Sequence, residues 1–453
     1  MFEQNTYNDG TITKAMDYRK FEQIWKELER KPKQKNAALQ MLKGLPDAEI
    51  ANNLDMKEAT VRKHIEKTYK AFGLNNRREL VSLCAQYKRE LVIGNNTINQ
   101  TKHMMQPLTG RVPLDSPLYL ERSADEKCRQ YLQAAQNREE SLPFIRIRAS
   151  KGMGKSSLLV RLCQFLERQQ KQAVGFIDLG SIDLSEFADL NQLLYQFTFV
   201  IAQKFSNKLN NHTPPDLKDY WRKDIASGLN CTNYLKEHIF SKIEQPKTLF
   251  IDGIDAVLGQ EKTQNPFLNL LRTWNESEMK LVSEVPIVWP SIVIAYSTEP
   301  YPEYGIKGSI MQNVGIEIDL KEFSPDETLE LAKRYGLNWS LNEVNLLRQL
   351  IGGHPALINR AFFEISQGHI TLAELEMKAT SPTSPFRDDL LKKLDLLEAN
   401  ENLKQCFNKI LSGERCTDEF ANFQLEKAGL IKVGQDEVKV ACELYRKYFD
   451  LHL

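Results

Sequence analysis

Five short apolar segments alternate with helical stretches through the middle of the chain. They are FIRIRA, AVGFIDL, TLFIDGID, SIVIAYST and GIEIDL, and they lie between about Val112 and Phe323. Strands that alternate with helices in this way form a parallel sheet whose faces are covered by the helices. The alternation therefore predicts an α/β core over residues 112–323.

The first of these segments leads into a loop with the composition of a phosphate-binding loop. In IRASKGMGKSSLLVRLCQFLERQ a strand is followed by a glycine-rich turn and then by a helix. Backbone N–H groups at the start of such a helix bind phosphate, the lysine reaches the β- and γ-phosphates, and the hydroxyl binds Mg²⁺. We therefore predict a nucleotide site with Ser156 as a metal ligand. Its predicted nucleotide-binding residues are Gly152, Met153, Gly154, Lys155, Ser156 and Ser157.

A second motif supports this interpretation over a chance Gly-Lys-Ser turn. The apolar strand TLFID ends in Asp252, whose carboxylate is placed to hold Mg²⁺ through water. One departure concerns Ala149, which stands where the usual motif has its first glycine. Alanine is small and fits there provided that its backbone φ is negative.

Hydrolysis is a separate question, because it needs an oriented water as well as the metal. Gly253 follows Asp252 and has no side chain to orient that water. Asp255 stands three residues after Asp252 and is the candidate substitute if the chain turns there. Ser297 and Thr298 end the next strand and are candidates for sensing the γ-phosphate or for capping the strand. We expect slow hydrolysis or none.

The N-terminal part of the chain is basic, although the whole protein has a net charge of zero. Residues 31–90 contain 13 Lys and Arg against 7 Asp and Glu, so the rest of the chain carries the opposite balance. Residues 33–90 are predicted as four short helices, with Gly44 ending the first and Asp55 and Glu58 forming a capping box for the third. A short helix, a turn and then a helix with exposed basic residues is the arrangement that binds the major groove of DNA. The alternative is a helical module that docks onto another protein.

This segment resembles the LuxR-type (GerE) helix-turn-helix. The matching residues are the turn around Leu42 to Pro46, AEIANNL, TVRKHIEKTYKAFGL and the start of the last helix at Asn76. The resemblance implies DNA binding, with Arg62 and Lys63 at base-reading positions and Thr60 at a phosphate, while Glu66 stands where the family often has lysine. The predicted DNA-facing residues are Thr60, Arg62, Lys63, Glu66 and Lys67.

The rest of the chain is similar to the AAA-like domain common in cyanobacterial proteins, within the STAND and origin-recognition-like AAA+ ATPases. DSPLYLER, DYWRKDIASGLNCTNYL, GLNWS, GGHPALI and CELYRKYF carry the similarity. It implies a P-loop NTPase core, a helical lid and a C-terminal winged helix over a bound nucleotide. Arg122 and Pro355 would flank that nucleotide. Relatives have Glu where this chain has Gly253, and often Arg where it has Glu299.

Composition excludes several other classes of protein. No apolar run reaches the ~18–20 residues that a membrane span needs, and the first twenty residues lack the apolar core of a signal peptide. Seven scattered cysteines without a CxxC spacing favour reduced thiols in a cytoplasm over a zinc site or a disulfide framework.

Together these features predict a multidomain α/β protein. The expected parts are an N-terminal extension (1–32), an all-α helix-turn-helix (33–90), a linker (91–111), the parallel-sheet P-loop core (112–323), a helical lid (324–385) and a winged helix (386–453). We expect a DNA-binding regulator controlled by ATP or ADP with Mg²⁺, acting as a nucleotide-dependent homo-oligomer. The alternatives are an AAA+ assembly ATPase that polymerises on DNA and recruits a protein partner, and a signalling adaptor.

Overall fold

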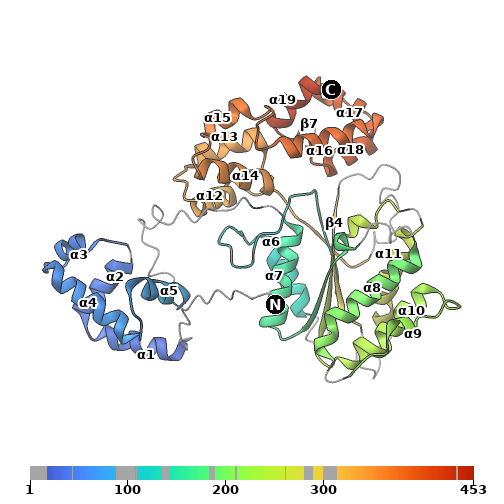
Figure 1. Ribbon diagram of the computed structural model, residues 1–453. Coiled ribbons are helices and arrows are strands. Elements are labelled where there is room, and N and C mark those ends of the chain that lie inside the picture. The colour runs from blue at the N-terminus through green and yellow to red at the C-terminus, as the bar shows by residue number, and fades with distance from the viewer. Residues whose placement is uncertain are drawn as a thin grey trace, which may run out of the picture. The chain divides into compact units, whose positions relative to one another are not determined.

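The chain divides into two units, Met1–Gln106 and Pro107–Leu453, which are described separately (Figure 1). In this computed structural model the described residues are 18–42, 44–87, 108, 110–134, 143–182, 189–209, 212–260, 262–279, 289–298, 314–434 and 437–453. Most of the predicted linker, and Glu299, lie outside them. Among the described helices none is both long and apolar enough to cross a membrane.

The first unit consists of helices, as the sequence predicts. They are α1 (Tyr18–Glu29), α2 (Pro32–Leu42), α3 (Asp47–Asn53), α4 (Glu58–Ala71) and α5 (Arg77–Tyr87). Val61 and Ile65 of α4 are fully buried, in agreement with their helical spacing. Phe21 of α1 packs against Phe72 with a ring-centroid distance of 5.3 Å. The hydrophobic core of this unit is therefore built on the inner face of α4.

The predicted capping box at the start of α4 is wrong. Lys57 is the N-cap residue, and no side chain caps the helix. Asp55 adopts a left-handed backbone with φ of 49° and belongs to the turn before it. A short polar side chain tolerates that conformation better than most, which explains why an aspartate stands there without capping. Gly44 follows α2 with φ of 84°, as predicted for a glycine that ends a helix.

The second unit is built on a five-stranded parallel sheet in the order β2-β3-β4-β1-β5. All five predicted strands are present. They are β1 (Phe144–Ala149), β2 (Ala173–Asp178), β3 (Lys247–Asp252), β4 (Ser291–Ser297) and β5 (Ile316–Asp319). Because the strands are parallel, Ala149, Asp178, Asp252 and Ser297 end at the same edge of the sheet.

Helices cover both faces of the sheet (Figure 1). One face packs against α6 (Ser123–Ala134) and α7 (Lys155–Arg168), with Phe250 of β3 in that layer. The other packs against α8 (Leu190–Phe205), α10 (Ser227–Tyr234) and α11 (Gln264–Met279), with Leu249 and Ile251 in that layer. Alternate residues of β3 thus enter opposite layers, and both layers are apolar, which explains its uninterrupted hydrophobic sequence.

Residues after the sheet form two further groups of helices. The first group is α12 (Pro325–Arg334), α13 (Leu341–Ile351), α14 (Pro355–Ser366) and α15 (Leu372–Lys378). The second is α16 (Arg387–Glu398), α17 (Glu401–Leu411), α18 (Glu419–Lys427), the antiparallel hairpin of β6 (Ile431–Val433) and β7 (Val438–Val440), and α19 (Glu443–His452). Three capping boxes, at Ser324, Ser340 and Thr371, start helices of the first group. The part of the chain after the sheet is therefore helical, with an antiparallel hairpin between α18 and α19.

The prediction of uniformly reduced cysteines is wrong at one place. Cys406 of α17 and Cys416 before α18 form a disulfide across a Cα–Cα distance of 5.4 Å. The turn between the two helices brings these residues together, which spacing along the sequence does not reveal. The other five cysteines are free.

Candidate functional site

The phosphate-binding loop has the backbone that its glycines predict. Gly152 and Gly154 have φ of 79° and 93°, and Gly154 is the N-cap residue of α7. A Cβ atom at Gly152 would lie 2.6 Å from Cε1 of His354, so a larger residue cannot fit there. Ala149 is not among the described non-glycine residues with positive φ, which are Asp55 and Lys171. Alanine at that position therefore leaves the loop without backbone strain.

The start of α7 presents the side chains expected to bind phosphate and metal. Nζ of Lys155 donates to the carbonyl oxygens of Ala149 and Ser150, at 2.8 and 3.0 Å. The hydroxyl of Ser156 bonds to the carboxylate of Asp252. Ser157 is buried and accepts a hydrogen bond from the backbone N–H of Val112 at 2.9 Å. Lys155 and Ser156 thus face the loop, whereas Ser157 fixes the segment that precedes the core.

Asp252 ends β3 as a buried carboxylate. Burial raises its pKa, while the Ser156 hydroxyl and the positive charge of Arg111 oppose that rise. Asp178 ends β2 and is in register with Asp252. These carboxylate and hydroxyl oxygens are the hard ligands that Mg²⁺ prefers, so the donor set fits this ion.

Gly253 and Asp255 differ from what an extended strand predicts. The strand ends at Asp252, Gly253 has φ of 72°, and Ile254–Ala256 form a 3-10 turn. Asp255 accepts a hydrogen bond from the backbone N–H of Ser297 at 2.6 Å. The chain therefore turns immediately after Asp252, which is the condition under which Asp255 is a candidate substitute, and the catalytic role of Asp255 stays a prediction. Asp255 connects the end of β3 to the end of β4 and also lines the cavity described next.

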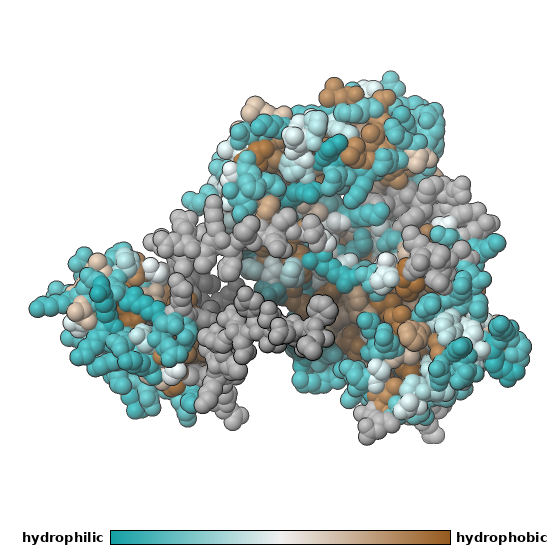
Figure 2. Space-filling view, viewed as in Figure 1, coloured by the Kyte–Doolittle hydropathy of each residue, from teal (hydrophilic) through white to brown (hydrophobic). Residues whose placement is uncertain are grey.

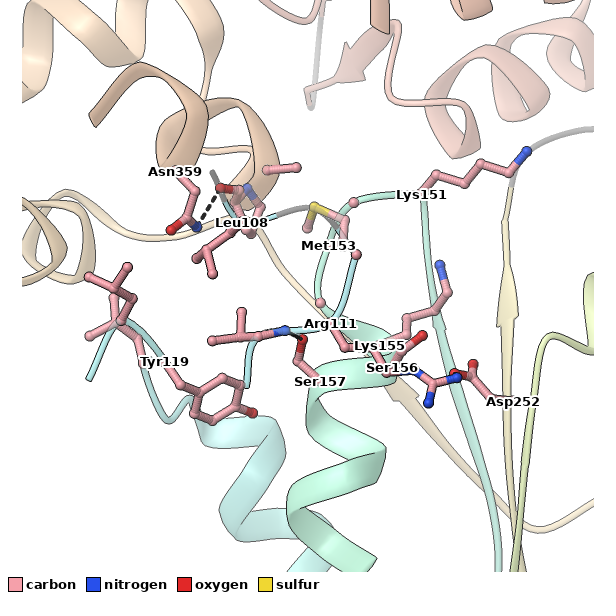
Figure 3. Close-up of a pocket in the computed structure, with 18 of the residues that line it drawn as sticks. Leu108, Arg111, Tyr119, Lys151, Met153, Lys155, Ser156, Ser157, Asp252 and Asn359 are labelled. Atoms are coloured by element: carbon pink, nitrogen blue, oxygen red, sulfur yellow. Dashed lines mark hydrogen bonds and ion pairs between the residues drawn. The ribbon is translucent and has the colours of Figure 1, made fainter. Parts of the chain in front are cut away.

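The predicted nucleotide residues meet in one cavity of about 550 Å³ (Figure 3). It brings together three segments that are far apart in the sequence: the stretch before the core, the phosphate-binding loop and the start of α14. Residues predicted from the sequence that line it are Arg122, Gly152, Met153, Gly154, Lys155, Ser156, Ser157, Asp252, Asp255 and Pro355. A mostly apolar wall of Leu108, Val112, Leu118, Leu120, Phe323 and Ala356 adds a surface suited to a flat ring.

Arg122 faces the phosphate loop. Its Nη2 would lie 3.1 Å from a Cβ atom on Gly154, and its guanidinium lies over the ring of Phe323 at 5.5 Å. Its Nε is buried and has no hydrogen-bond partner among the described residues. A guanidinium N–H that has no partner and lies beside a phosphate-binding loop is suited to donate a hydrogen bond to a phosphate.

The start of α14 reaches the phosphate loop through His354. This half-buried side chain bonds through Nε2 to the carbonyl oxygen of Lys151 at 2.9 Å, and burial lowers its pKa. A neutral imidazole donates that proton to the carbonyl. His354 therefore joins the helices after the sheet to the phosphate-binding loop. Pro355 is the first residue of α14 and lines the cavity.

Several residues that line the cavity were not predicted from the sequence, among them Arg111, Asp178 and Asn359. Arg111 fell in the predicted linker, Asp178 ends an ordinary strand, and Asn359 lies one turn into α14. Asp178 could have been found, since it ends the strand AVGFID at the edge where Asp252 ends its own. Neither Arg111 nor Asn359 belongs to a motif that the sequence reveals.

The predicted DNA-facing residues all lie on the exposed face of α4. Thr60, Arg62, Lys63, Glu66 and Lys67 are exposed, and the surface over α3 and α4 is mostly hydrophilic in Figure 2. Glu66 pairs with Lys70 at 2.6 Å, and the guanidinium of Arg62 pairs with Asp47 and Glu58. Within the described residues Lys63 and Lys67 have no ion-pair partner. These two lysines can bind phosphates without first breaking an ion pair.

The comparisons with known proteins agree with both resemblances. Residues 108–451 match the family model described as an AAA-like domain. The chain belongs to the AAA-like domain family. Residues 32–84 match the model of bacterial regulatory proteins of the luxR family. This AAA-like protein therefore carries a LuxR-type helix-turn-helix before its nucleotide-binding fold.

A solved structure with a TM-score of 0.50 shares the fold at low sequence identity. A Walker-type ATPase of Pyrococcus abyssi has a TM-score of 0.50 and 15% identity, over 73% of this chain and 96% of that chain. The ORC2 protein of Aeropyrum pernix has a TM-score of 0.39 and 11% identity, over 75% and 97% of the two chains. No match was found among curated proteins. The likeness to the Pyrococcus abyssi ATPase describes the fold of the AAA-like domain alone.

Proposed function

We propose that this AAA-like protein is a DNA-binding regulator controlled by a bound nucleotide. ATP or ADP with Mg²⁺ occupies the cavity of about 550 Å³ and acts as a conformational and oligomerisation switch. The observation that carries the proposal is the convergence of Arg122, Lys155 and Pro355 on that cavity from three separate segments. A nucleotide that touches all three segments favours the arrangement in which they are close together.

The regulatory output acts through the LuxR-type unit. The exposed lysines and Arg62 of α4 bind DNA, and the rest of the protein controls how many such units act together. Linked or oligomeric DNA-binding units gain affinity because each raises the effective concentration of the next. We therefore propose that ADP favours a closed monomer and ATP an open form that oligomerises, in a cytoplasmic protein that controls transcription.

The elements after the sheet are proposed as the moving parts. Helices α12–α15 would form a lid, whose His354 bonds to the phosphate loop. Helices α16–α19 with the β6–β7 hairpin would form a winged helix. Its contact with the core includes the Thr298 hydroxyl, which donates to the carbonyl oxygen of Lys427 at 2.9 Å. This hydrogen bond joins the end of β4 to α18 of the second helical group. A movement of the end of β4 would therefore be transmitted to that group.

Weak hydrolysis is the second part of the proposal. The position after Asp252 is a glycine in a left-handed conformation, and Asp255 already accepts the N–H of Ser297. No glutamate therefore orients an attacking water from that position. We expect turnover well below the ~1–100 s⁻¹ of efficient phosphoryl-transfer enzymes. A faster ATPase activity that disappears in Lys155→Ala would contradict this part.

The deciding experiment asks which nucleotide the purified protein carries and what that nucleotide changes. Denaturing extraction identifies bound ATP or ADP, thermal unfolding measures stabilisation, and light scattering measures assembly with each nucleotide. Mobility shifts of DNA by the wild type, Arg62→Ala and Lys63→Ala test the DNA-binding unit. An empty protein whose melting temperature and assembly do not respond to ATP would contradict nucleotide control. Unchanged mobility shifts with both variants would instead favour a protein-binding adaptor.

A further inference from the structure

Arg111 places a positive charge at the proposed metal site. Its guanidinium pairs with Asp178 and lies 3.5 Å from the carboxylate of Asp252 (Figure 3). It also lies over the ring of Phe176, at 4.9 Å from the centroid. Asp178 and Asp252 are register partners on neighbouring strands, so their carboxylates lie close together. Two adjacent carboxylates are stable as anions when a cation lies between them, and Arg111 supplies one.

The residues that follow Arg111 are fixed to α7. The N–H of Val112 donates to Ser157, and the guanidinium of Arg161 donates to the carbonyl oxygens of Val112 and Pro113 at 3.0 and 2.7 Å. Gly110, on the other side of Arg111, has φ of 78°, and no atom of the described residues lies within 4 Å of a Cβ position there. Arg111 therefore lies between a fixed point at Val112 and an uncrowded glycine, and it can leave the carboxylates without disturbing α7.

A divalent cation and a guanidinium compete for the same carboxylates. Mg²⁺ takes oxygen ligands in a near-octahedral shell of small radius, which leaves no room for an arginine fork on the same oxygens. If one cation binds there, the other must leave, and each weakens the binding of the other by the same factor. The carboxylates of Asp178 and Asp252 thus have two alternative partners.

We propose that Arg111 is a built-in competitor of Mg²⁺. Asp252 and Asp178 would hold the Mg²⁺ of the nucleotide complex, Arg111 would then leave them, and Gly110 and Arg111, close in sequence to the boundary between the two units at Gln106, would be freed. The metal, rather than the nucleotide alone, is then what releases the stretch leading to the DNA-binding unit. This inference rests on the proposed nucleotide function and adds to it the residue that senses the metal.

The test compares Mg²⁺ titrations of the full-length wild type and Arg111→Gln at a fixed concentration of a fluorescent ATP analogue. We expect the Mg²⁺ concentration at half-maximal binding to fall about tenfold in the variant, within the usual range for coupled sites. Arg222→Gln is the matched control, because Arg222 forms an exposed ion pair with Asp224, and it should titrate like the wild type. An unchanged or higher Mg²⁺ requirement in Arg111→Gln would overturn the proposal.

A second measurement does not depend on the variant. Hydrogen exchange at the backbone N–H groups of Gly110 and Arg111 in the wild type should become faster when Mg²⁺ is added to the nucleotide-bound protein in place of a chelator. Equal exchange with and without Mg²⁺ would overturn the inference while nucleotide binding itself remained intact. If Arg111 instead binds phosphate, Arg111→Gln will weaken nucleotide binding equally with and without Mg²⁺, which would also overturn it. Failure of the wild type to bind any nucleotide would contradict the proposed function as well.

Discussion

The proposed DNA-facing surface and the proposed nucleotide cavity are built in opposite ways. The first is the exposed face of one helix, α4, and its polar side chains all come from one short stretch of the sequence. The second joins residues from segments as far apart as Arg122 and Pro355 around a backbone loop. The affinity of a surface of the first kind for its ligand depends on charge and on salt concentration, because its side chains already lie in water. A cavity of the second kind depends on which segments are close together, so ligand binding there is linked to conformation.

The largest effect should come from Lys155→Ala, which tests the cavity side of this contrast. At a ligand concentration of 100 times the dissociation constant, a bound nucleotide stabilises a folded protein by ~2.7 kcal/mol. We expect most of this stabilisation to disappear in the variant, as measured by the shift in melting temperature on adding ATP. Lys204→Ala changes an exposed lysine of α8 and should keep the shift. An undiminished shift in Lys155→Ala would break the contrast, because the loop would then not be the ligand site.

The next effect concerns the DNA-facing surface. Replacing both Lys63 and Lys67 with Ala should weaken DNA binding to all sequences alike. It should also reduce the slope of log affinity against log salt by about 1 for each phosphate that the protein no longer neutralises. Fluorescence anisotropy at several salt concentrations measures both quantities. Lys26→Ala removes an exposed lysine of α1 and is the control. A slope equal to that of the wild type would show that these lysines do not bind phosphate.

A smaller effect, on the stability of the second unit, is expected from a substitution at Gly253. The cause there is backbone conformation and not charge. A non-glycine residue at φ of 72° costs about 1–2 kcal/mol, and a Cβ there would lie 3.2 Å from the backbone nitrogen of Gly180. Gly253→Ala should therefore lower the denaturant midpoint of the second unit. Gly228 lies in α10, and the methyl group of Gly228→Ala would make an ordinary contact with Leu270 of α11. This control substitution should not lower the denaturant midpoint. Equal midpoints for the wild type and Gly253→Ala would contradict the left-handed turn.

The smallest effect is a pH dependence at His354. Burial lowers its pKa, so the folded protein binds a proton there less readily than the unfolded chain does. As the pH falls below about 6.5, the usual pKa of histidine, the unfolded state gains that proton and stability decreases. The decrease should be smaller in His354→Gln, whose amide can still donate to the carbonyl of Lys151. His369→Gln, at an exposed position, is the control, and melting temperatures between pH 5.5 and 7.5 give the comparison. An equal decrease in the wild type and His354→Gln would show that this histidine does not sense pH.

Local features of the site were predictable because they depend on neighbouring residues. Glycine at positions 152 and 154 permits the positive φ of the loop, and the helix that starts at Lys155 follows from its apolar period. The spacing of Val61 and Ile65 similarly predicted the buried face of α4. Errors arose where a residue pattern has two solutions. An aspartate three residues before Glu58 is compatible with a helix cap and with a turn, and in the structure Asp55 lies in a turn.

The sequence alone determined the strands, the phosphate-binding loop and the exposed basic helix, since each depends on side-chain period and backbone preference within a few residues. Tertiary structure alone decided the pairing of Arg111 with Asp178 and Asp252, the hydrogen bond from Ser297 to Asp255 and the disulfide of Cys406 with Cys416. These interactions join residues from different elements, and the order of strands in the sheet and the turns between helices determine which elements meet. An amino-acid sequence contains the groups but not the distances between them, and those distances set the chemistry of this cavity.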